Sequence, residues 1–402
     1  MNKILVLLFM SGLIACTGQQ SDKTDENKQS AANRRTYAED RQLLKQYHPE
    51  LVELKLGEAS ALVCPAYQGR LMTSSADGQA SYGWINYELI QSKKILPHMN
   101  AFGGEDRFWL GPEGGQFALY FKKGDPFDGD HWQTPAAIDS EAFRLADMTP
   151  SSATFTRTIE LINYSGTPLT IGVERTVSLL PVSEIEQLVG TKTDSLKVVG
   201  IRSDNTIINR GQNAWTTKTG MPSIWILGMM NASPSSTIIV PFKTGTGNPI
   251  NDSYFGKVPA DRLKIGENAA LFKADANYRS KIGVSPARAT QWLGSYDPSL
   301  KTLTLVTYSY DPANQLYVNS AWELQKDPFS GDVINAYNDG PMKPGQPQMG
   351  QFYEMESSSP AAALSPNGRL RHQHTTIHLQ GPESALNSIA QKLLSINLAA
   401  LE

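Results

Sequence analysis

The sequence predicts an all-β protein in which antiparallel sheets pack as a sandwich, with a short helix at each end of the folded part. Segments of strand length alternate or run apolar and are rich in Thr, Val, Ile and Tyr. Gly, Pro, Asn and Asp separate these segments, and helical periodicity is nearly absent between them. Strands without interleaved helices pair antiparallel and bury one face against a second sheet. No repeat of fixed period is visible, so we expect one domain from 37 to 402.

The first 15 residues predict a lipoprotein signal peptide. Lys3 provides a positive start, and the apolar run at 4–15 is too short to span a bilayer as a mature helix. The run ends in LIAC at 13–16, the pattern of a lipobox. We therefore expect Cys16 to carry lipid and to hold the protein in the bacterial envelope, on the periplasmic side or at the outer-membrane surface. The alternative is an ordinary secretory signal in which the cysteine occurs by chance.

Residues 16–36 predict a disordered tether. Apart from Cys16 they hold no apolar side chain larger than alanine and are rich in Gln, Ser, Asn, Asp and Lys, so they cannot bury enough surface to fold. Helical patterns follow at about 38–47 and at about 384–396, where the leucines and Ile389 fall on one face. The segments that most clearly indicate strands are 153–163, 169–180, 236–243, 301–310 and 351–359.

Charge, cysteine content and missing motifs exclude several classes of protein. A net charge of -3 without any long basic run argues against nucleic-acid binding. If Cys16 carries lipid, Cys64 has no disulfide partner, and its apolar surroundings predict a buried inert thiol. No P-loop, Rossmann fingerprint or Gly-x-Ser-x-Gly elbow occurs, so nucleotide, hydride and serine-hydrolase chemistry have no support.

The stretch GGEDRFWLGPEGGQF at 103–117 holds more polar side chains than a turn requires. Arg107 can bind vicinal hydroxyls or a carboxylate with its two-pronged guanidinium, and Trp109 offers a flat apolar face on which a sugar ring can stack. Glu105, Glu113 and Gln116 are further candidate sugar contacts. The alternative is an internal salt bridge from Arg107 to one of the two acids before it.

The segment FYEMESSS predicts two carboxylates on one face of a strand. Strand alternation places Glu354, Glu356 and Ser358 on one side and Tyr353, Met355 and Ser357 on the other. If the glutamate side faces a pocket, the nearness of the two acids should raise one pKa and leave a base and an acid at neutral pH. A solvated outer face is the alternative.

Half of the six histidines lie in RLRHQHTTIHL, where alternation places His372, His374 and His378 on one face. Three histidines at this spacing can bind zinc, but they serve equally as hydrogen-bond donors to a sugar or as packed core residues. We expect no metal or other cofactor here, and we favour His374 as a general acid.

Two further clusters are polar. The acidic loop KGDPFDGDHWQTP matches no EF-hand, and we expect His131 and Trp132 to contact a glycan at the rim of a site, with a plain acidic turn as the alternative. A face near 275–281 carries Asp275, Arg279 and Lys281. These three side chains suit an acidic sugar, although a salt-bridge ladder between strands is the more economical interpretation.

Four segments, CPAYQGRLMTSS, GGEDRFWLGPEGGQF, NAYNDGP and QFYEMESSSPAAALSPNGRLRHQHTTIHL, resemble the opening and closing parts of galactose mutarotase-like proteins. The superfamily includes aldose 1-epimerases, and the likeness is to an uncharacterised lipoprotein branch of it in gut-type Bacteroidetes. The resemblance implies a β-supersandwich whose concave face holds a sugar, with no obligatory cofactor. It also implies that a late-strand glutamate takes the proton from the anomeric hydroxyl, and Glu354 or Glu356 falls at that place; we favour Glu354.

One departure from that group affects the predicted activity. Aldose 1-epimerases carry a histidine acid in a mid-chain His-x-Tyr-Phe-Asn-Leu-like motif, whereas residues 142–371 of this chain contain no histidine. The resemblance therefore implies the fold and the sugar ligand but leaves the reaction open, because function belongs to the site and not to the fold.

Two functions fit these observations. The first is a lipid-anchored carbohydrate-active protein with acid-base chemistry, epimerase-like or glycan-processing. The second is a non-catalytic glycan-binding lipoprotein. An enzyme should place a carboxylate and a second proton-transfer group around one sugar-sized pocket, whereas a binding module can rely on aromatic rings and neutral amides. A purely structural envelope protein would have no pocket. The expected partners are a sugar or oligosaccharide and the membrane, and we expect a monomer.

Overall fold

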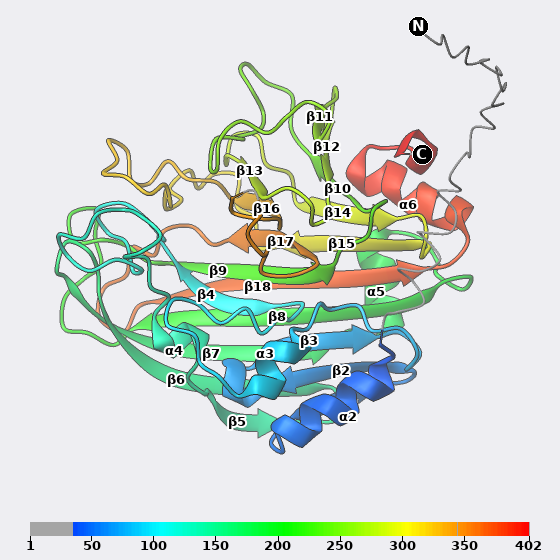
Figure 1. Cartoon of the computed structure of the whole chain (residues 1–402), viewed down its shortest axis with the longest axis horizontal. Helices are drawn as coiled ribbons and strands as arrows, with labels where there is room; N and C mark the ends of the chain where they lie inside the picture. The colour runs from blue at the N-terminus through cyan, green and yellow to red at the C-terminus, as the bar shows by residue number, and fades with distance from the viewer. Residues whose placement is uncertain (1–34, 344, 402) are drawn as a thin grey trace, which may run out of the picture.

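The structure is a computed structural model that describes residues 35–343 and 345–401 (Figure 1). The predicted signal peptide, the lipidation site Cys16 and nearly all of the predicted tether lie outside the described residues. All named strands pair antiparallel, which confirms the predicted all-β antiparallel fold. In the described part of the chain, no helix is long and apolar enough to cross a membrane.

A ten-stranded sheet forms one layer, in the order β11-β12-β10-β14-β15-β18-β8-β7-β6-β5 (Figure 1). Its strands are β5 (Arg144–Met148), β6 (Ser152–Ile162), β7 (Pro168–Leu179), β8 (Lys197–Asn209), β10 (Thr237–Pro241), β11 (Leu263–Ile265), β12 (Ala269–Lys273), β14 (Trp292–Asp297), β15 (Thr302–Tyr308) and β18 (Arg369–Gln380). Four of the predicted strand segments lie in this sheet, as β6, β7, β10 and β15.

The second layer is a five-stranded sheet in the order β13-β16-β17-β9-β4, beside a three-stranded sheet, β1-β2-β3. The strands are β1 (Val52–Leu56), β2 (Ala59–Cys64), β3 (Arg70–Ser75), β4 (Arg107–Gly111), β9 (Ser223–Asn231), β13 (Ser280–Val284), β16 (Ile334–Asn338) and β17 (Phe352–Ser358). An isolated bridge between Leu71 and Asp106 links the two sheets edge to edge. The fifth predicted strand segment is β17.

The two predicted helices are present as α2 (Tyr37–Tyr47) and α6 (Glu383–Leu394). Shorter helical segments were not predicted from the sequence, and they are η1 (Pro65–Tyr67), α3 (Tyr87–Ser92), α4 (Ala136–Asp139), α5 (Val182–Val189) and η2 (Leu398–Leu401). Each is too short for a helical period to stand out. In α5, for example, only Ile185 and Val189 are buried, and Gly190 ends the helix in the left-handed region.

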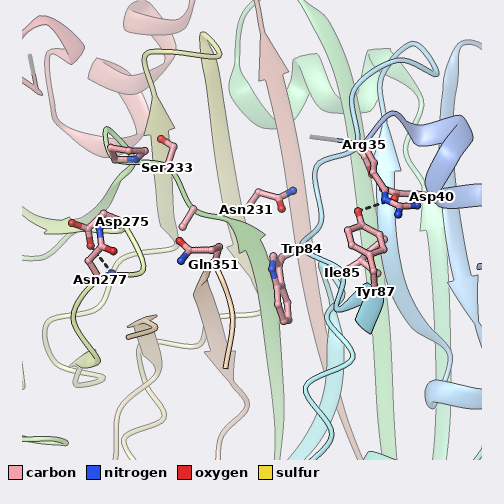
Figure 2. A pocket seen from close by; sticks show the side chains of 13 residues that line it. Arg35, Asp40, Trp84, Ile85, Tyr87, Asn231, Ser233, Asp275, Asn277 and Gln351 are labelled. Atoms are coloured by element: carbon pink, nitrogen blue, oxygen red, sulfur yellow. Dashed lines mark hydrogen bonds between the residues drawn. The ribbon is translucent and has the colours of Figure 1, made fainter. Parts of the chain in front are cut away.

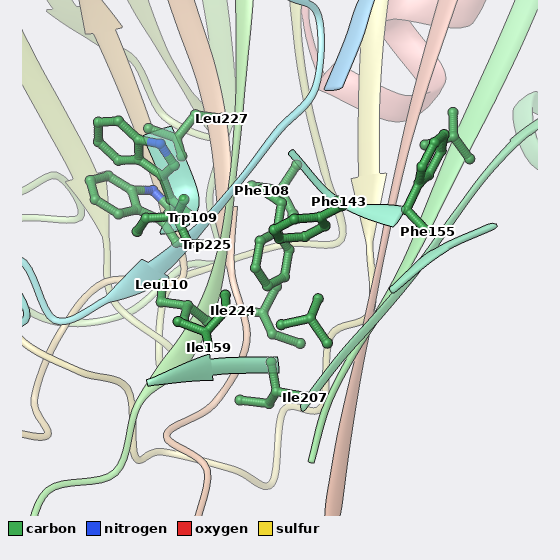
Figure 3. Packing of buried hydrophobic residues seen from close by; sticks show 14 of the residues in the cluster. Phe108, Trp109, Leu110, Phe143, Phe155, Ile159, Ile207, Ile224, Trp225 and Leu227 are labelled. Atoms are coloured by element: carbon green, nitrogen blue, oxygen red, sulfur yellow. The ribbon is translucent and has the colours of Figure 1, made fainter. Parts of the chain in front are cut away.

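The main core lies between the two layers. Figure 3 shows Phe108 and Ile224 on one side of the β4–β9 pair, with Phe143 beside Phe108. Trp109 and Trp225 lie together on the opposite side of the same strands (Figure 3). Strand alternation produces this division, so the five-stranded sheet is apolar inward and carries large aromatic side chains outward.

Three histidines of β18 are buried between the layers. His372 Nε2 and His374 Nδ1 lie 2.8 and 2.9 Å from the Ser357 hydroxyl oxygen of β17. His378 Nε2 lies 3.0 Å from the carboxylate of Glu105. The three histidines share one face, as predicted, but this face is the interior of the sandwich. Burial lowers the pKa of His372 to about 3 and that of His374 to about 4, so both rings are neutral at pH 7.

Stability is expected to fall in weak acid because of these two rings. In the unfolded chain a histidine gains its proton below about pH 6.5, whereas His372 and His374 stay neutral in the fold. Stability is therefore full above that pH and falls between about pH 6.5 and 4, by about 1.4 kcal/mol per pH unit for each histidine. Urea unfolding between pH 4 and 8 measures the slope. His372→Gln should reduce it and exposed His131→Gln should not; an unchanged slope in His372→Gln would contradict the explanation.

The structure agrees with the prediction that Cys64 is a buried inert thiol. Cys64 is a free, fully buried cysteine at the end of β2, and burial raises its pKa to about 12. The thiol is therefore protonated at neutral pH and is not a nucleophile.

Candidate functional site

A cleft of about 320 Å³ lies on the outer side of the five-stranded sheet. Both kinds of side chain that bind sugars line it. The charged ones are Arg107, Glu113, Arg279, Lys281 and Glu354. The aromatic ones are Trp109, Trp132, Trp225, Phe255, Trp322, Tyr337 and Phe352. The volume and the mixture of apolar walls with a few polar groups are typical of a small-molecule site.

The alternation of β17 directs its glutamates to this outer side. Tyr353 and Ser357 face the ten-stranded sheet. The Tyr353 hydroxyl oxygen lies 2.7 Å from the Ser295 hydroxyl oxygen, and Ser357 contacts His372 and His374 of β18. Glu354 and Glu356 consequently face the opposite way, on the side of the cleft. The prediction that the two glutamates share a face is confirmed, and that face is not a solvated one, since both residues are buried.

Glu354 lies on the floor of the cleft in an ion pair with Arg107. Arg107 Nη2 donates to Glu354 Oε1 at 2.5 Å, and the side chains are 3% and 8% exposed. Burial raises the pKa of Glu354 to about 7, Arg107 opposes that rise, and the charge of Glu356 adds to it. Glu354 can thus gain or lose a proton near neutral pH, as a general acid-base group must.

Glu356 is held differently, by a cation and an indole. Its Oε2 accepts from Lys281 Nζ and from Trp225 Nε1, each at 2.9 Å. The second carboxylate oxygen, Oε1, is buried and has no hydrogen-bond partner among the described residues. Glu356 does not line the cleft itself. Its charge affects the cleft indirectly, because it raises the pKa of Glu354.

Glu113 is the second carboxyl group that lines the cleft, and it comes from the loop after β4. Burial raises its pKa, while the nearby Lys281 lowers it. Its backbone N–H donates to the Ser320 hydroxyl at 3.1 Å, which ties this loop to the segment before β16. Glu113 and Glu354 therefore reach one cleft from different elements, and both favour the protonated form more than an exposed glutamate does.

The tryptophans divide between floor and wall. Trp109 is only 4% exposed and packs against Trp225 and Tyr120, with the Arg107 guanidinium 4.7 Å from its ring centre. Trp132 and Trp322 stack on each other at 6.0 Å and are only partly buried. The more accessible rings for stacking are therefore Trp132 and Trp322, whereas Trp109 is largely covered.

Several predicted site residues lie elsewhere. Glu105 is fully buried between the layers, bound to Ser74 and His378. The Gln116 amide bonds the backbone of Gln325 through both its oxygen and its nitrogen. His131 is exposed, with Nδ1 2.6 Å from Asp128, and does not line the cleft.

The prediction that His374 acts across a sugar ring from a β17 glutamate is wrong in its geometry. Its Nδ1 contacts Ser357, which points into the sandwich, while Glu354 and Glu356 point out of it. The sheet itself separates the two. The alternative of a salt bridge from Arg107 to a neighbouring acid is not found either, since Arg107 pairs with Glu354 and not with Glu105 or Asp106.

Much of the cleft wall was not predicted from the sequence. Trp225, Trp322, Tyr337 and Phe255 come from β9, from β16 and from two loops, and none lies in a polar cluster that would draw attention. Arg279 and Lys281 were recognised as one polar face, and both line the cleft. Asp275, from the same face, instead pairs with Arg262 and Lys273.

A second cavity of about 510 Å³ lies beside the cleft, near the N-terminal helix (Figure 2). Trp84 lines it and packs on Phe352 of the cleft, with ring centres 4.6 Å apart. Asp40, which also lines it, is satisfied by the hydroxyls of Ser81 and Tyr87. Although it is the larger space, it lacks the combination found in the cleft, where Glu354, with a pKa raised to about 7, and Glu113 lie with the stacked Trp132 and Trp322.

Arg107 is expected to control the pH at which Glu354 titrates. Replacing it with methionine removes the charge that lowers the pKa of Glu354, so that pKa should rise. If Arg107 also holds a ligand, sugar affinity should fall about 10- to 150-fold, the scale of a lost charged hydrogen bond. Carboxyl ¹³C NMR titration and ligand titration measure the two effects. A Glu354 pKa that stays in place would contradict the ion pair.

The fold and the cleft together define a class: a β-sandwich protein with an acidic and aromatic cleft on the outer face of its smaller sheet. The chain belongs to DUF6786, a family of unknown function, whose sequence profile matches residues 35–402. No curated protein matches the sequence.

Several solved structures follow a partly similar chain path at low sequence identity. The Slr1438 protein of Synechocystis sp. PCC 6803 is 11% identical, with a TM-score of 0.49 over 83% of this chain and 96% of that one. A galactose mutarotase related enzyme from Lactobacillus acidophilus is 10% identical, with a TM-score of 0.44 over 82% and 97%. A galactose mutarotase-like protein from Lactobacillus casei is 11% identical, with a TM-score of 0.42 over 82% and 99%. At this distance the likeness assigns no activity.

Proposed function

We propose that the protein binds a sugar in the cleft and exchanges protons with it through Glu354, as a carbohydrate epimerase-like or mutarotase-like enzyme. The observation that carries the proposal is the position of Glu354 and Glu113 in one cleft with stacked tryptophans on its wall. Two carboxyl groups whose pKa values are raised by burial can supply a base and an acid to the same ring.

The proposed step is the opening and closing of a sugar ring. The Glu354 carboxylate takes the proton of the anomeric hydroxyl, while protonated Glu113 gives its proton to the ring oxygen and the bond between C1 and that oxygen breaks. After rotation about the C1–C2 bond, Glu113 takes its proton back, Glu354 returns its own to the former anomeric oxygen, and the ring closes as the other anomer. Lys281 and Glu356 keep the floor of the cleft close to electrical balance.

A non-catalytic glycan-binding protein is the second candidate. The wall formed by Trp132 and Trp322 favours it, because aromatic stacking binds sugars without any proton transfer. Under this alternative the buried ion pairs Arg107–Glu354 and Lys281–Glu356 would only hold the side chains at the floor of the cleft in place and would transfer no proton.

One experiment separates the two functions. The folded part, 35–402, is titrated with a panel of neutral and acidic monosaccharides and oligosaccharides by thermal shift, and each binder is then followed by NMR exchange spectroscopy. An enzyme should speed interconversion of the anomers or epimers of a bound sugar, and a binding protein should not. Binding without any faster exchange would support the second candidate, and no binding across the panel would contradict both.

We also propose that the protein is anchored to a membrane through Cys16. Cys16→Ser should move the protein from the membrane fraction to the soluble fraction, because the sulfur atom of Cys16 is the one that would carry the lipid. The measurement is fractionation of the expressing cells followed by immunoblotting. Thr17→Ala, which alters the next residue and keeps the thiol, is the control and should stay with the membranes. A Cys16→Ser protein that still sediments with membranes would contradict the anchor.

A further inference from the structure

Arg279 is a cation of the cleft that the proposed reaction does not use. It precedes β13 and lines the cleft, with its guanidinium carbon 3.7 Å from the centre of the Phe255 ring. Its side chain is half-buried, and its Nε is buried without a hydrogen-bond partner. Across the described residues, no hydrogen bond or ion pair engages this guanidinium, although the carboxyl groups of Glu113 and Glu354 line the same cleft.

The other two cations of the cleft are neutralised by close partners. Arg107 pairs with Glu354 and Lys281 pairs with Glu356. The remaining acids near Arg279 are Glu113 and Asp339; neither forms an ion pair with it among the described residues, and burial raises the pKa of both. Of the two arginines and one lysine that line the cleft, Arg279 is therefore the one without an ion-pair partner among the described residues.

Arg262 provides a comparison within the protein, because it is an arginine that stacks on an aromatic ring outside the cleft. Arg262 also lies over an aromatic ring, 5.3 Å from the centre of Tyr278, but it forms an ion pair with the buried Asp275. Arg262 does not line the cleft. Of two arginines in similar stacked positions, the one facing the cleft is the one without an acid.

We propose that the sugar bound in the cleft is acidic, and that Arg279 binds its carboxylate or sulfate group. This inference rests on the proposed function and names the class of substrate. A planar guanidinium binds two oxygens of such a group at once, and the Phe255 ring beneath it restricts its orientation before the ligand arrives. A neutral sugar would leave Arg279 without an ion-pair partner.

The test compares matched sugars on the wild-type protein. Galacturonate and glucuronate are titrated beside galactose and glucose, their methyl uronate esters, and galactose 6-sulfate. We expect at least one acidic sugar to bind about 10- to 150-fold more tightly than its neutral counterpart, the range of a charged hydrogen bond, and the preference to shrink as salt is raised. The esters keep the shape and lose the charge, so they should bind like the neutral sugars. The uronate and sulfate arms identify the anionic group.

Variants then assign the preference to one residue. Arg279→Gln should remove the preference for acidic sugars while leaving the affinity for neutral ones within a few-fold, and Arg262→Gln should retain it. Thermal melting of each variant verifies folding. Equal affinity of the wild-type protein for acidic and neutral sugars, or a preference that survives Arg279→Gln, would overturn this inference and leave the proposed function intact. Failure of every sugar to bind would overturn the proposed function itself.

Discussion

Glu354→Gln is expected to lower the rate of sugar interconversion about 100- to 10,000-fold, the usual contribution of a general acid-base group. Glutamine keeps the shape and one acceptor oxygen toward Arg107, so sugar binding should stay within about tenfold. NMR exchange rates and ligand titration, made on the same samples, separate the two quantities. An exchange rate within about threefold of wild type would remove Glu354 from the mechanism.

The pH dependence of the same rate provides a second test. As the base, Glu354 must be ionised, and its pKa is raised to about 7, chiefly by burial. The rate should therefore increase with pH through a midpoint near 7 and decline at lower pH as Glu354 becomes protonated. The exposed Glu160→Gln is the matched control and should leave both the rate and its midpoint unchanged.

Glu356→Gln should have a milder effect on the rate of sugar interconversion than Glu354→Gln, because Glu356 does not line the cleft.

Arg175→Met is expected to cost about 3–5 kcal/mol of stability, the typical result of removing one member of a buried ion pair. Arg175 is fully buried between the sheets and donates to Asp106 Oδ1 and to Asn205 Oδ1, each at 2.6 Å, and to the Gly69 carbonyl at 3.0 Å. Without the arginine, the Asp106 carboxylate is left buried and unpaired. Equilibrium urea unfolding at pH 7 measures the loss.

An exposed arginine of the ten-stranded sheet is the control for this effect. Arg371 pairs with Asp204 on the surface, where its side chain is 61% exposed. Water and salt screen such a pair, so Arg371→Met should change stability by less than about 1 kcal/mol. Similar losses in the two variants would mean that the buried pair contributes no more than the surface pair.

Local pattern was sufficient for several of the strands, for the two terminal helices and for the relative sides of residues along a strand. The period of two placed Glu354 with Glu356 and placed His372 with His374 and His378, because successive side chains of any strand point to opposite faces. Apolar and β-branched runs likewise located β6, β7 and β17, and the helical pattern at each end located α2 and α6.

The period of two does not determine which face of a strand is buried. The buried face of β18 turned out to be the one that carries the histidines, so they lie in the core and not at the cleft. His374 and Glu354 were both expected at the sugar, yet the packing of β17 on the ten-stranded sheet turns Ser357 and the histidines inward and the glutamates outward. That outcome depends on sheet-to-sheet packing, which is absent from any single strand.

Contacts distant in sequence were decided by the tertiary structure as well. Arg107 and Glu354 are 247 residues apart, and strand β9 between them brings them to the same floor. Lys281 reaches Glu356 across β16 in the same way. The sequence determined the candidate charges, the all-β fold class and which residues share a side within a strand. Only the pairing order of the strands decided which charges meet, because burial and the distance between charges, which set their pKa values, are properties of the assembled sheet.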